Sequence, residues 1–202
     1  MEIDNRKCTF LILLDLSAAF DTVDPSILLR RLQFKFGICG SALNLLKSYL
    51  VGRKQCILVN CKSSSESVLS SGVPQGSVLG PILFTLYTSP LGDIVRKYGL
   101  SFHLYADDTQ LYISFTPNCP SSFNLSKLQL ENCISEIRKW MSKNFLKLND
   151  DKTEYLLLGS RHRLSKSAQD NPPVVLGNCD IFSSYSARNI GAIFDSFMIM
   201  GA

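Results

Sequence analysis

The sequence predicts an α+β fold in which an antiparallel sheet, built around a hairpin, packs on helices, with a small sheet near the C-terminus. Apolar and polar residues alternate on both sides of the Tyr-Ala-Asp-Asp segment at 105–108, which is the period of two that a hairpin requires. The continuous apolar run from Phe10 to Leu14 indicates a strand buried on both faces. Between Phe123 and Asn144, apolar residues recur at helical spacing instead.

The composition indicates a globular chain and excludes several classes of protein. Its 202 residues, 46% of them hydrophobic, suit one large domain or two small ones with a sizeable core. The net charge of +4 permits a polyanionic partner without requiring one. The seven cysteines form no Cys-x-x-Cys pair, so we predict neither a disulfide framework nor a zinc site, but reduced thiols in an intracellular compartment. No apolar run is long enough to cross a bilayer, and no membrane partner is expected.

Capping and turn residues predict the first helices and strands after the buried strand. Asp24-Pro25 has the residue types of a helix N-cap followed by the first turn. A second helix is predicted from about Ser41 to Leu50, because Gly52 follows it. Two short strands are then expected, at Gln55–Val59 and about Glu66–Leu69.

The segment Gly72 to Ser77, Gly-Val-Pro-Gln-Gly-Ser, is a distinctive loop before a long apolar helix predicted from Val78 to about Lys97. Backbone amides at such a helix start face outward and favour contact with a phosphate or a template. An ordinary loop capped by Ser77 fits this stretch equally well.

The helix predicted from Phe123 to Asn144 has an apolar face, and we expect Trp140 to belong to the core. We place on that face Leu125, Leu128, Ile134, Ile137 and Met141. A second hairpin is expected after it, with strands Phe145–Leu148 and Thr153–Leu158 and with Lys152 at its mouth.

The C-terminal part begins with a polar, basic connection from Ser160 to Pro173. A solvated loop is favoured over nucleic-acid contact for its charges, which belong to Arg161, His162, Arg163 and Lys166. Short strands of a small sheet are predicted beyond it, at Val174–Leu176, Cys179–Phe182 and Asn189–Phe194.

Adjacent carboxylates at Asp107 and Asp108 form the first candidate site, in the predicted tight turn. Like charges placed together cost stability unless a cation neutralises them, and their hard oxygen atoms suit Mg2+, with Mn2+ as a second choice. Asp is also favoured in turns for backbone reasons, so an acidic turn without function is the alternative. Asp15 adds a third carboxylate at the end of a buried strand, where packing alone does not explain it.

Four stretches resemble, in order and spacing, successive motifs of reverse transcriptases from non-LTR (LINE-type) retrotransposons. They are Leu14–Asp24, Gly72–Pro81, Tyr105–Gln110 and Leu148–Glu154, and Asn189–Asp195 resembles the strand that follows near the primer grip. The resemblance covers nearly the whole chain. It implies a polymerase palm that copies an RNA template onto a DNA primer from deoxynucleoside triphosphates, with two Mg2+ ions.

The resemblance also assigns roles to single residues. Asp15 and Asp107 would hold the two ions, with Asp108 supporting the site as a third metal-site carboxylate. Phe20 would lie under the incoming sugar and exclude a 2'-hydroxyl, and Lys152 would protonate the leaving pyrophosphate. The other implied substrate contacts are Leu16, Ser17, Ala18 and Ala19, whose backbone would approach the triphosphate, Gln75 with Gly76 against the template–nucleotide pair, and Pro74 and Tyr105.

By the same resemblance we expect a palm core at residues 1–159, with partial fingers elements at about 25–70. A basic linker and truncated palm and thumb-junction strands would fill 160–202, and fingers and thumb would be largely missing, as in a piece of a larger element. Two functions stay open: an RNA-directed DNA polymerase, or a non-catalytic remnant that at most binds nucleic acid or a partner. Another palm-type enzyme, such as a nucleotide cyclase, would share the paired carboxylates but not the Pro-Gln-Gly loop.

Overall fold

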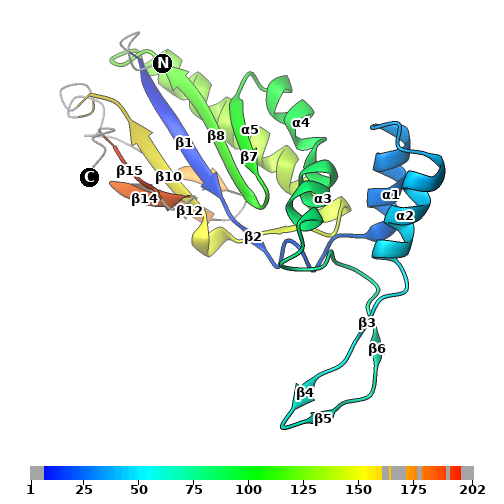
Figure 1. Cartoon of the computed structure of the whole chain (residues 1–202). Coiled ribbons are helices and arrows are strands. Elements are labelled where there is room, and N and C mark those ends of the chain that lie inside the picture. Colours follow the sequence, from blue (N-terminus) through cyan, green and yellow to red (C-terminus); the bar gives the residue numbers. More distant parts are fainter. Residues whose placement is uncertain (1–6, 161–163, 165–171, 177–178, 190–191, 197–202) are drawn as a thin grey trace.

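A computed structural model of the chain describes residues 7–160, 164, 172–176, 179–189 and 192–196 (Figure 1). Its centre is a five-stranded sheet in the order β13-β10-β1-β8-β7. The strands are β1 (Cys8–Leu14), β7 (Ser101–Tyr105), β8 (Asp108–Phe115), β10 (Glu154–Leu158) and β13 (Ser183–Ser184). β1 pairs antiparallel with both β8 and β10, which places the end of β1 next to the β7–β8 turn.

Strand β1 is buried along its whole length because both faces of the sheet are covered, as the sequence predicts. Phe10, Ile12 and Leu14 belong to the large core shared with helices that include α3 (Leu79–Thr88), α4 (Leu91–Lys97) and α5 (Pro120–Lys143). Leu11 and Leu13 point the other way and pack in a smaller cluster, with residues that include Ala187 and Phe194 of the C-terminal strands.

Among the described residues, five helices accompany the sheet, and Figure 1 shows α3, α4 and α5 beside it. Helices α1 and α2 pack on each other, and α1 also packs on α3. The bounds of the five helices are α1 Pro25–Phe34, α2 Gly40–Leu50, α3 Leu79–Thr88, α4 Leu91–Lys97 and α5 Pro120–Lys143. The predicted cap of α1 is confirmed, because Asp24 Oδ1 accepts hydrogen bonds from Ser26 N at 2.8 Å and Ile27 N at 2.9 Å.

The single long helix predicted from Val78 to Lys97 is wrong, since the structure has two helices there. The break falls at Ser89 and Pro90. Proline lacks the N–H that would continue the ladder of α3, and its ring crowds the preceding turn. The chain therefore restarts as α4, which packs against both α5 and β7.

Helix α5 starts at Pro120, three residues before the predicted start at Phe123. Its buried stripe is Ser126, Leu130, Cys133, Ile134, Ile137 and Met141. Leu125 and Leu128 are 60% and 54% exposed, so placing them on the core face was wrong. Both leucines lie beside the stripe because the sheet contacts only one side of the helix. Trp140 packs against the core while partly exposed, as expected.

The second predicted hairpin is also wrong, because its two strands pair with different partners. β9 (Lys147–Leu148) pairs with β2 (Leu16–Ser17), whereas β10 pairs with β1. A short 3-10 helix, η1 (Asp150–Lys152), separates β9 from β10 and redirects the chain. As a result, the segment that follows Asp15 lies beside the segment that precedes Lys152.

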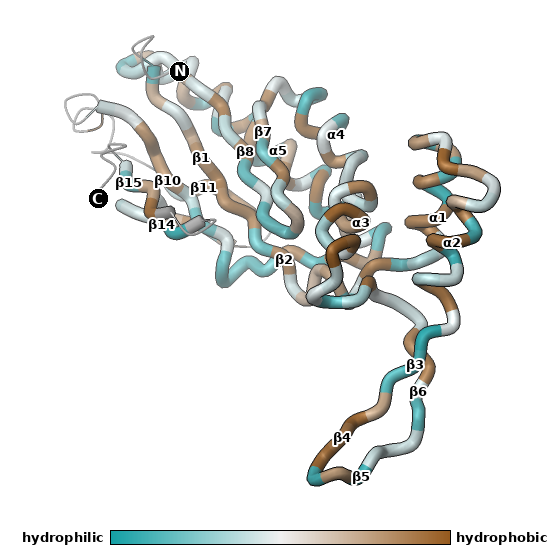
Figure 2. Tube along the Cα trace, viewed as in Figure 1, coloured by the Kyte–Doolittle hydropathy of each residue, from teal (hydrophilic) through white to brown (hydrophobic). Residues whose placement is uncertain are grey.

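A narrow ribbon projects from the body between α2 and α3 (Figure 1). It consists of β3 (Lys54–Gln55) paired with β6 (Ser67–Val68), and β4 (Leu58–Val59) paired with β5 (Lys62–Ser63). The predicted strand at Gln55–Val59 is therefore split into β3 and β4, and β5 lies in the segment predicted to connect the two strands, whereas β6 falls within the predicted strand at Glu66–Leu69. Figure 2 shows an apolar stretch at β4, and Ile57, Leu58 and Val59 are 69%, 70% and 60% exposed.

The predicted C-terminal sheet is replaced by separate pairings. β11 (Val174–Leu176) pairs with β12 (Cys179–Ile181), β14 (Ser186–Asn189) pairs with β15 (Ala192–Asp195), and β13 joins the main sheet parallel to β10. The basic residues of the predicted connection, Arg161, His162, Arg163 and Lys166, lie outside the described residues. Among the helices described, none combines the length and apolar character needed to span a membrane.

Candidate active site

The β7–β8 hairpin turns over two residues, Ala106 and Asp107, and pairs Tyr105 with Asp108. Ala106 has a φ of 52°, in the left-handed region that tight two-residue turns use. The sequence predicts both aspartates in the turn, but Asp108 is the first residue of β8. Tyr105 is 65% exposed at the end of β7, beside the two carboxylates in the chain.

Asp15 reaches the same end of the sheet from β1. Leu14 is paired with Thr109, so the next step in the antiparallel register places Asp15 towards Asp108. Partial burial raises the pKa of the Asp108 carboxyl above its usual range, and the negative charges of Asp107 and Asp15 raise it further. Asp107 and Asp15 are therefore close enough to Asp108 for their charges to act on its carboxyl group.

The described residues contain no group of three His, Cys, Asp or Glu side chains arranged to hold a metal ion. The predicted convergence of Asp15, Asp107 and Asp108 on shared ions thus stays a prediction. Mg2+ itself is held by one or two carboxylates, with water and substrate phosphates as the other ligands. The carboxylate oxygens at this end of the sheet are hard ligands and are partly exposed, so they suit Mg2+.

Asn149, to which sequence reasoning gave no role, contacts Asp15 twice. Its side-chain nitrogen Nδ2 donates to Asp15 Oδ2 at 3.1 Å, and its backbone N–H donates to the Asp15 carbonyl at 2.9 Å. The pairing of Leu148 with Leu16 brings Asn149 there. Lys152 follows on the same turn, with its side chain exposed and its backbone N–H donating to the Asn149 carbonyl at 3.3 Å.

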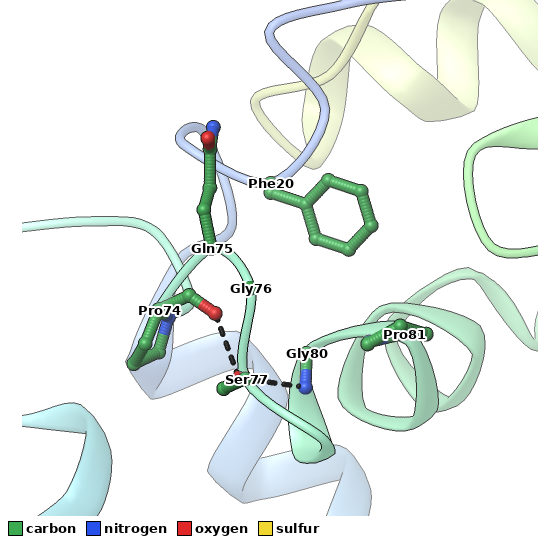
Figure 3. Close-up of a pocket in the computed structure, with 7 residues that line it drawn as sticks. All are labelled: Phe20, Pro74, Gln75, Gly76, Ser77, Gly80 and Pro81. Atoms are coloured by element: carbon green, nitrogen blue, oxygen red, sulfur yellow. Dashed lines mark hydrogen bonds between the residues drawn. The ribbon is translucent and has the colours of Figure 1, made fainter.

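Phe20 and the Pro-Gln-Gly loop line a pocket of about 380 Å³ (Figure 3). Its lining residues are Phe20, Pro74, Gln75, Gly76, Ser77, Gly80 and Pro81. The Phe20 ring is partly exposed and packs on Phe84, with ring centroids 5.1 Å apart. Ser77 Oγ donates to the Pro74 carbonyl and accepts from Gly80 N, which closes the start of α3 as a cap does.

The loop is fastened to the turn that carries Phe20. Val73 N donates to the Phe20 carbonyl at 2.8 Å, and Gly72 N donates to the Val23 carbonyl at 2.7 Å. Gly72 has a φ of +90°, and an added Cβ would lie 3.1 Å from the Asp21 carbonyl oxygen, so only glycine allows this close approach. The two segments therefore form one unit.

Gln75 is oriented by Asp21, a second contact that sequence reasoning missed. Its Nε2 donates to both Asp21 carboxylate oxygens, at 3.1 and 3.2 Å. An ionised carboxylate only accepts hydrogen bonds, so the amide nitrogen must face Asp21. The amide oxygen of Gln75 is then presented as an acceptor to whatever enters from solvent.

The turn between Asp15 and Phe20 is compact. Leu16 and Ser17 form β2, Leu16 and Ala19 are buried, and Ala18 is exposed with a φ of 49°. The Ala18 carbonyl accepts from the backbone N–H of Asp21 at 3.1 Å. The predicted approach of this backbone to a triphosphate stays a prediction.

The sequence profile of the reverse transcriptase (RNA-dependent DNA polymerase) family matches residues 2–191 of the chain. The chain belongs to this family. Two relatives of this reverse transcriptase chain are probable RNA-directed DNA polymerases of Drosophila melanogaster. That from transposon BS is 30% identical over 98% of this chain and 21% of its own length. That from transposon X-element is 27% identical over 95% of this chain and 20% of its own length.

A third relative is the RNA-directed DNA polymerase from mobile element jockey of Drosophila funebris, 25% identical over 90% of this chain and 19% of its own length. The reverse transcriptase chain thus spans about a fifth of the length of these relatives. They confirm the predicted resemblance to LINE-type elements.

Solved structures of telomerase share the fold of this reverse transcriptase chain. Apo telomerase from Candida tropicalis, truncated from its C-terminal domain, has a TM-score of 0.62 at 12% identity, over 95% of this chain and 35% of that one. Candida albicans telomerase in complex with a TWJ fragment of telomeric RNA has a TM-score of 0.61 at 13% identity, over 93% and 30%. The predicted mixture of helices and a sheet is thereby confirmed as a fold that telomerase shares.

Proposed function

We propose that the chain is the palm of an RNA-directed DNA polymerase, which joins a deoxynucleotide to the 3'-hydroxyl of a DNA primer paired with an RNA template. The observation that carries the proposal is that Asp107 and Asp15 lie near enough to Asp108, at one end of the sheet, for their charges to raise its pKa. Membership of the family and relatives named RNA-directed DNA polymerases support it. The likeness to a telomerase solved with an RNA fragment supports a nucleic-acid template.

Asp15 and Asp107 are the proposed ligands of two divalent cations, with Asp108 as their supporting carboxylate. Mg2+ suits these oxygen donors best, and Mn2+ would also be accepted. When bound, such ions lower the pKa of an attacking hydroxyl and stabilise charge on a triphosphate. The chain's part would be to hold the carboxylates in place for those ions, and the pairing of β1 with β8 supports this role.

The pocket of Phe20 and Gln75 is the proposed place of the incoming nucleotide. Phe20 would exclude a 2'-hydroxyl by its bulk, while Gln75, Pro74 and Gly76 would contact the template–nucleotide pair. Lys152, exposed on the turn after Asn149, would donate a proton to the leaving pyrophosphate. The backbone of Leu16 to Ala19 and the exposed Tyr105 would complete the substrate contacts.

We assign the palm core to residues 1–159, with α1, α2 and the ribbon as its fingers side, and 160–202 to the connection towards a thumb. A non-catalytic remnant remains the second candidate function.

The test compares wild type with Asp107→Asn in two measurements. Thermal unfolding is followed in EDTA and in Mg2+, and we expect Mg2+ to stabilise wild type more, because the cation relieves repulsion that the variant largely lacks. Incorporation of labelled dTTP on a poly(rA) template with an oligo(dT) primer is compared with that of Asp107→Asn, and incorporation above that blank would refute the remnant. Equal Mg2+ responses would refute the metal site. A normal Mg2+ response without incorporation would favour the remnant.

A further inference from the structure

Asn149 donates hydrogen bonds to Asp15 from both its side chain and its main chain. We propose that Asn149 is a positioning residue, which holds carboxylate oxygen Oδ2 of Asp15 and leaves Oδ1 to face a divalent cation. The inference rests on the proposed function, because it concerns how one of the proposed metal ligands is set.

The chemistry of the contact suits this role. A carboxylate only accepts hydrogen bonds, so the Asn149 nitrogen, not its oxygen, must face Asp15 Oδ2 at 3.1 Å. The amide is neutral, and it therefore satisfies one oxygen without cancelling the negative charge that a cation needs. The second bond, from Asn149 N to the Asp15 carbonyl at 2.9 Å, fixes the backbone from which the carboxylate extends.

Asn149 is itself firmly held. Its carbonyl accepts from Thr153 Oγ1 at 2.9 Å and from Lys152 N at 3.3 Å, which closes the turn of η1. Thr153 is buried, so this turn is anchored in the body of the protein. On the other side, Leu148 is paired with Leu16 and is buried as well.

An ion pair with Arg138 of helix α5 fixes Asp150, the residue that follows Asn149. Arg138 Nη2 and Nη1 donate to the two carboxylate oxygens of Asp150, at 2.7 and 3.1 Å. Such bidentate pairs are directional as well as strong. Both side chains here are about two-thirds buried. Ile137, the neighbour of Arg138 on α5, belongs to the core. Arg138 therefore links the core to Asp150, and Asp150 follows Asn149, the residue that contacts Asp15.

A carboxylate ligand that is held by a neighbouring donor cannot rotate freely, and this preorganisation strengthens metal binding. Partners that orient a metal ligand from behind typically contribute a factor of about 10 to 100 in affinity. Asp108, on the neighbouring strand, is close enough to Asp15 for their like charges to interact, and it would push the Asp15 carboxylate away. Asn149 is the donor that opposes this displacement.

The experiment measures Mn2+ affinity of the complete chain by the electron paramagnetic resonance of free Mn2+. Asn149→Ala should weaken Mn2+ binding by about 10- to 100-fold, while the melting temperature in EDTA stays close to that of wild type. Asn44→Ala, an exposed asparagine on α2, is the matched control and should bind Mn2+ as wild type does. Asp15→Asn should abolish the tight site.

The outcomes separate this inference from the proposed function. If Asn149→Ala binds Mn2+ as tightly as wild type while Asp15→Asn and Asp107→Asn lose the site, the positioning role is refuted and the metal site stands. If neither aspartate variant changes Mn2+ affinity, the proposed metal site fails, and the positioning role fails with it.

A measurement on wild type covers the case in which Asn149→Ala does not fold. In 15N-edited NMR, substoichiometric Mn2+ should broaden the side-chain amide pair of Asn149 and spare that of Asn44. An Asn149 amide pair that stays sharp would overturn the proposal.

Discussion

Replacing Phe20 with alanine separates a packing role of this ring from a role in sugar selection. Truncation of a fully buried phenylalanine costs roughly 3 to 5 kcal/mol. Phe20 is partly exposed, and one of its faces packs on Phe84 at 5.1 Å while the rest lines the pocket of about 380 Å³. We therefore expect a loss of about half the full value, roughly 2 kcal/mol. For a chain of this size, that loss lowers the melting temperature by about 4 to 8 °C.

The assay pairs urea unfolding with the ratio of deoxyribonucleotide to ribonucleotide incorporated in primer extension. Phe84→Ala is the matched control, because Phe84 is 0% exposed and should cost the full 3 to 5 kcal/mol. Phe20→Ala should admit ribonucleotides, since the space left by the ring can hold a 2'-hydroxyl, whereas folded Phe84→Ala should discriminate as wild type does. If Phe20→Ala costs as much stability as Phe84→Ala and leaves sugar selection unchanged, the ring belongs to the core and the steric assignment is refuted.

Two further predictions concern charged contacts. Folded Asp108 has a raised pKa, so the folded state binds its proton more tightly than the unfolded state, and stability falls as pH rises through the raised pKa. In EDTA at pH 7, Asp108→Asn should therefore unfold at higher urea than wild type, with the difference vanishing near pH 4; an equal difference at both pH values would contradict this. Asp21→Ala should free the Gln75 amide, which is exposed, at a cost of no more than about 0.5 kcal/mol. The NMR signals of the Gln75 side-chain amide protons should shift in this variant. Unchanged signals would show that Asp21 does not orient Gln75.

Local patterns in the sequence predicted the elements whose residues decide their own structure. The buried strand β1 follows from its unbroken apolar run, the β7–β8 hairpin from alternation, and the start of α1 from Asp24 and Pro25. Each of these signals acts within a few residues. The candidate carboxylates could be named for the same reason, since Asp15 ends one such strand and Asp107 lies in the turn of the hairpin.

The features that the sequence did not predict correctly are those that tertiary contacts determine. A two-residue strand such as β9 has no periodicity, so its pairing with β2 rather than β10 depends on how the chain folds back. The contact between Asn149 and Asp15 follows from that pairing, and sequence spacing could not show it. Leu125 was placed on the core face because several faces of α5 carry apolar residues, and only the position of the sheet selects one.

Arg53 gives the projecting ribbon a closed base. Its guanidinium donates to the carbonyls of Leu50 at 3.2 Å and Ser71 at 3.0 Å, and also to that of Gly72, so it ties the end of α2 to the start of the Pro-Gln-Gly loop. Beyond this tie, the short strands at the ribbon tip, β4 and β5, pair with each other. Because doubling the length of a flexible segment costs only about 0.6 kcal/mol of closure entropy, insertions and deletions at the ribbon tip should be tolerated. The ribbon is accordingly where we expect the greatest variation in length between related chains, while Arg53 keeps the spacing at its base constant.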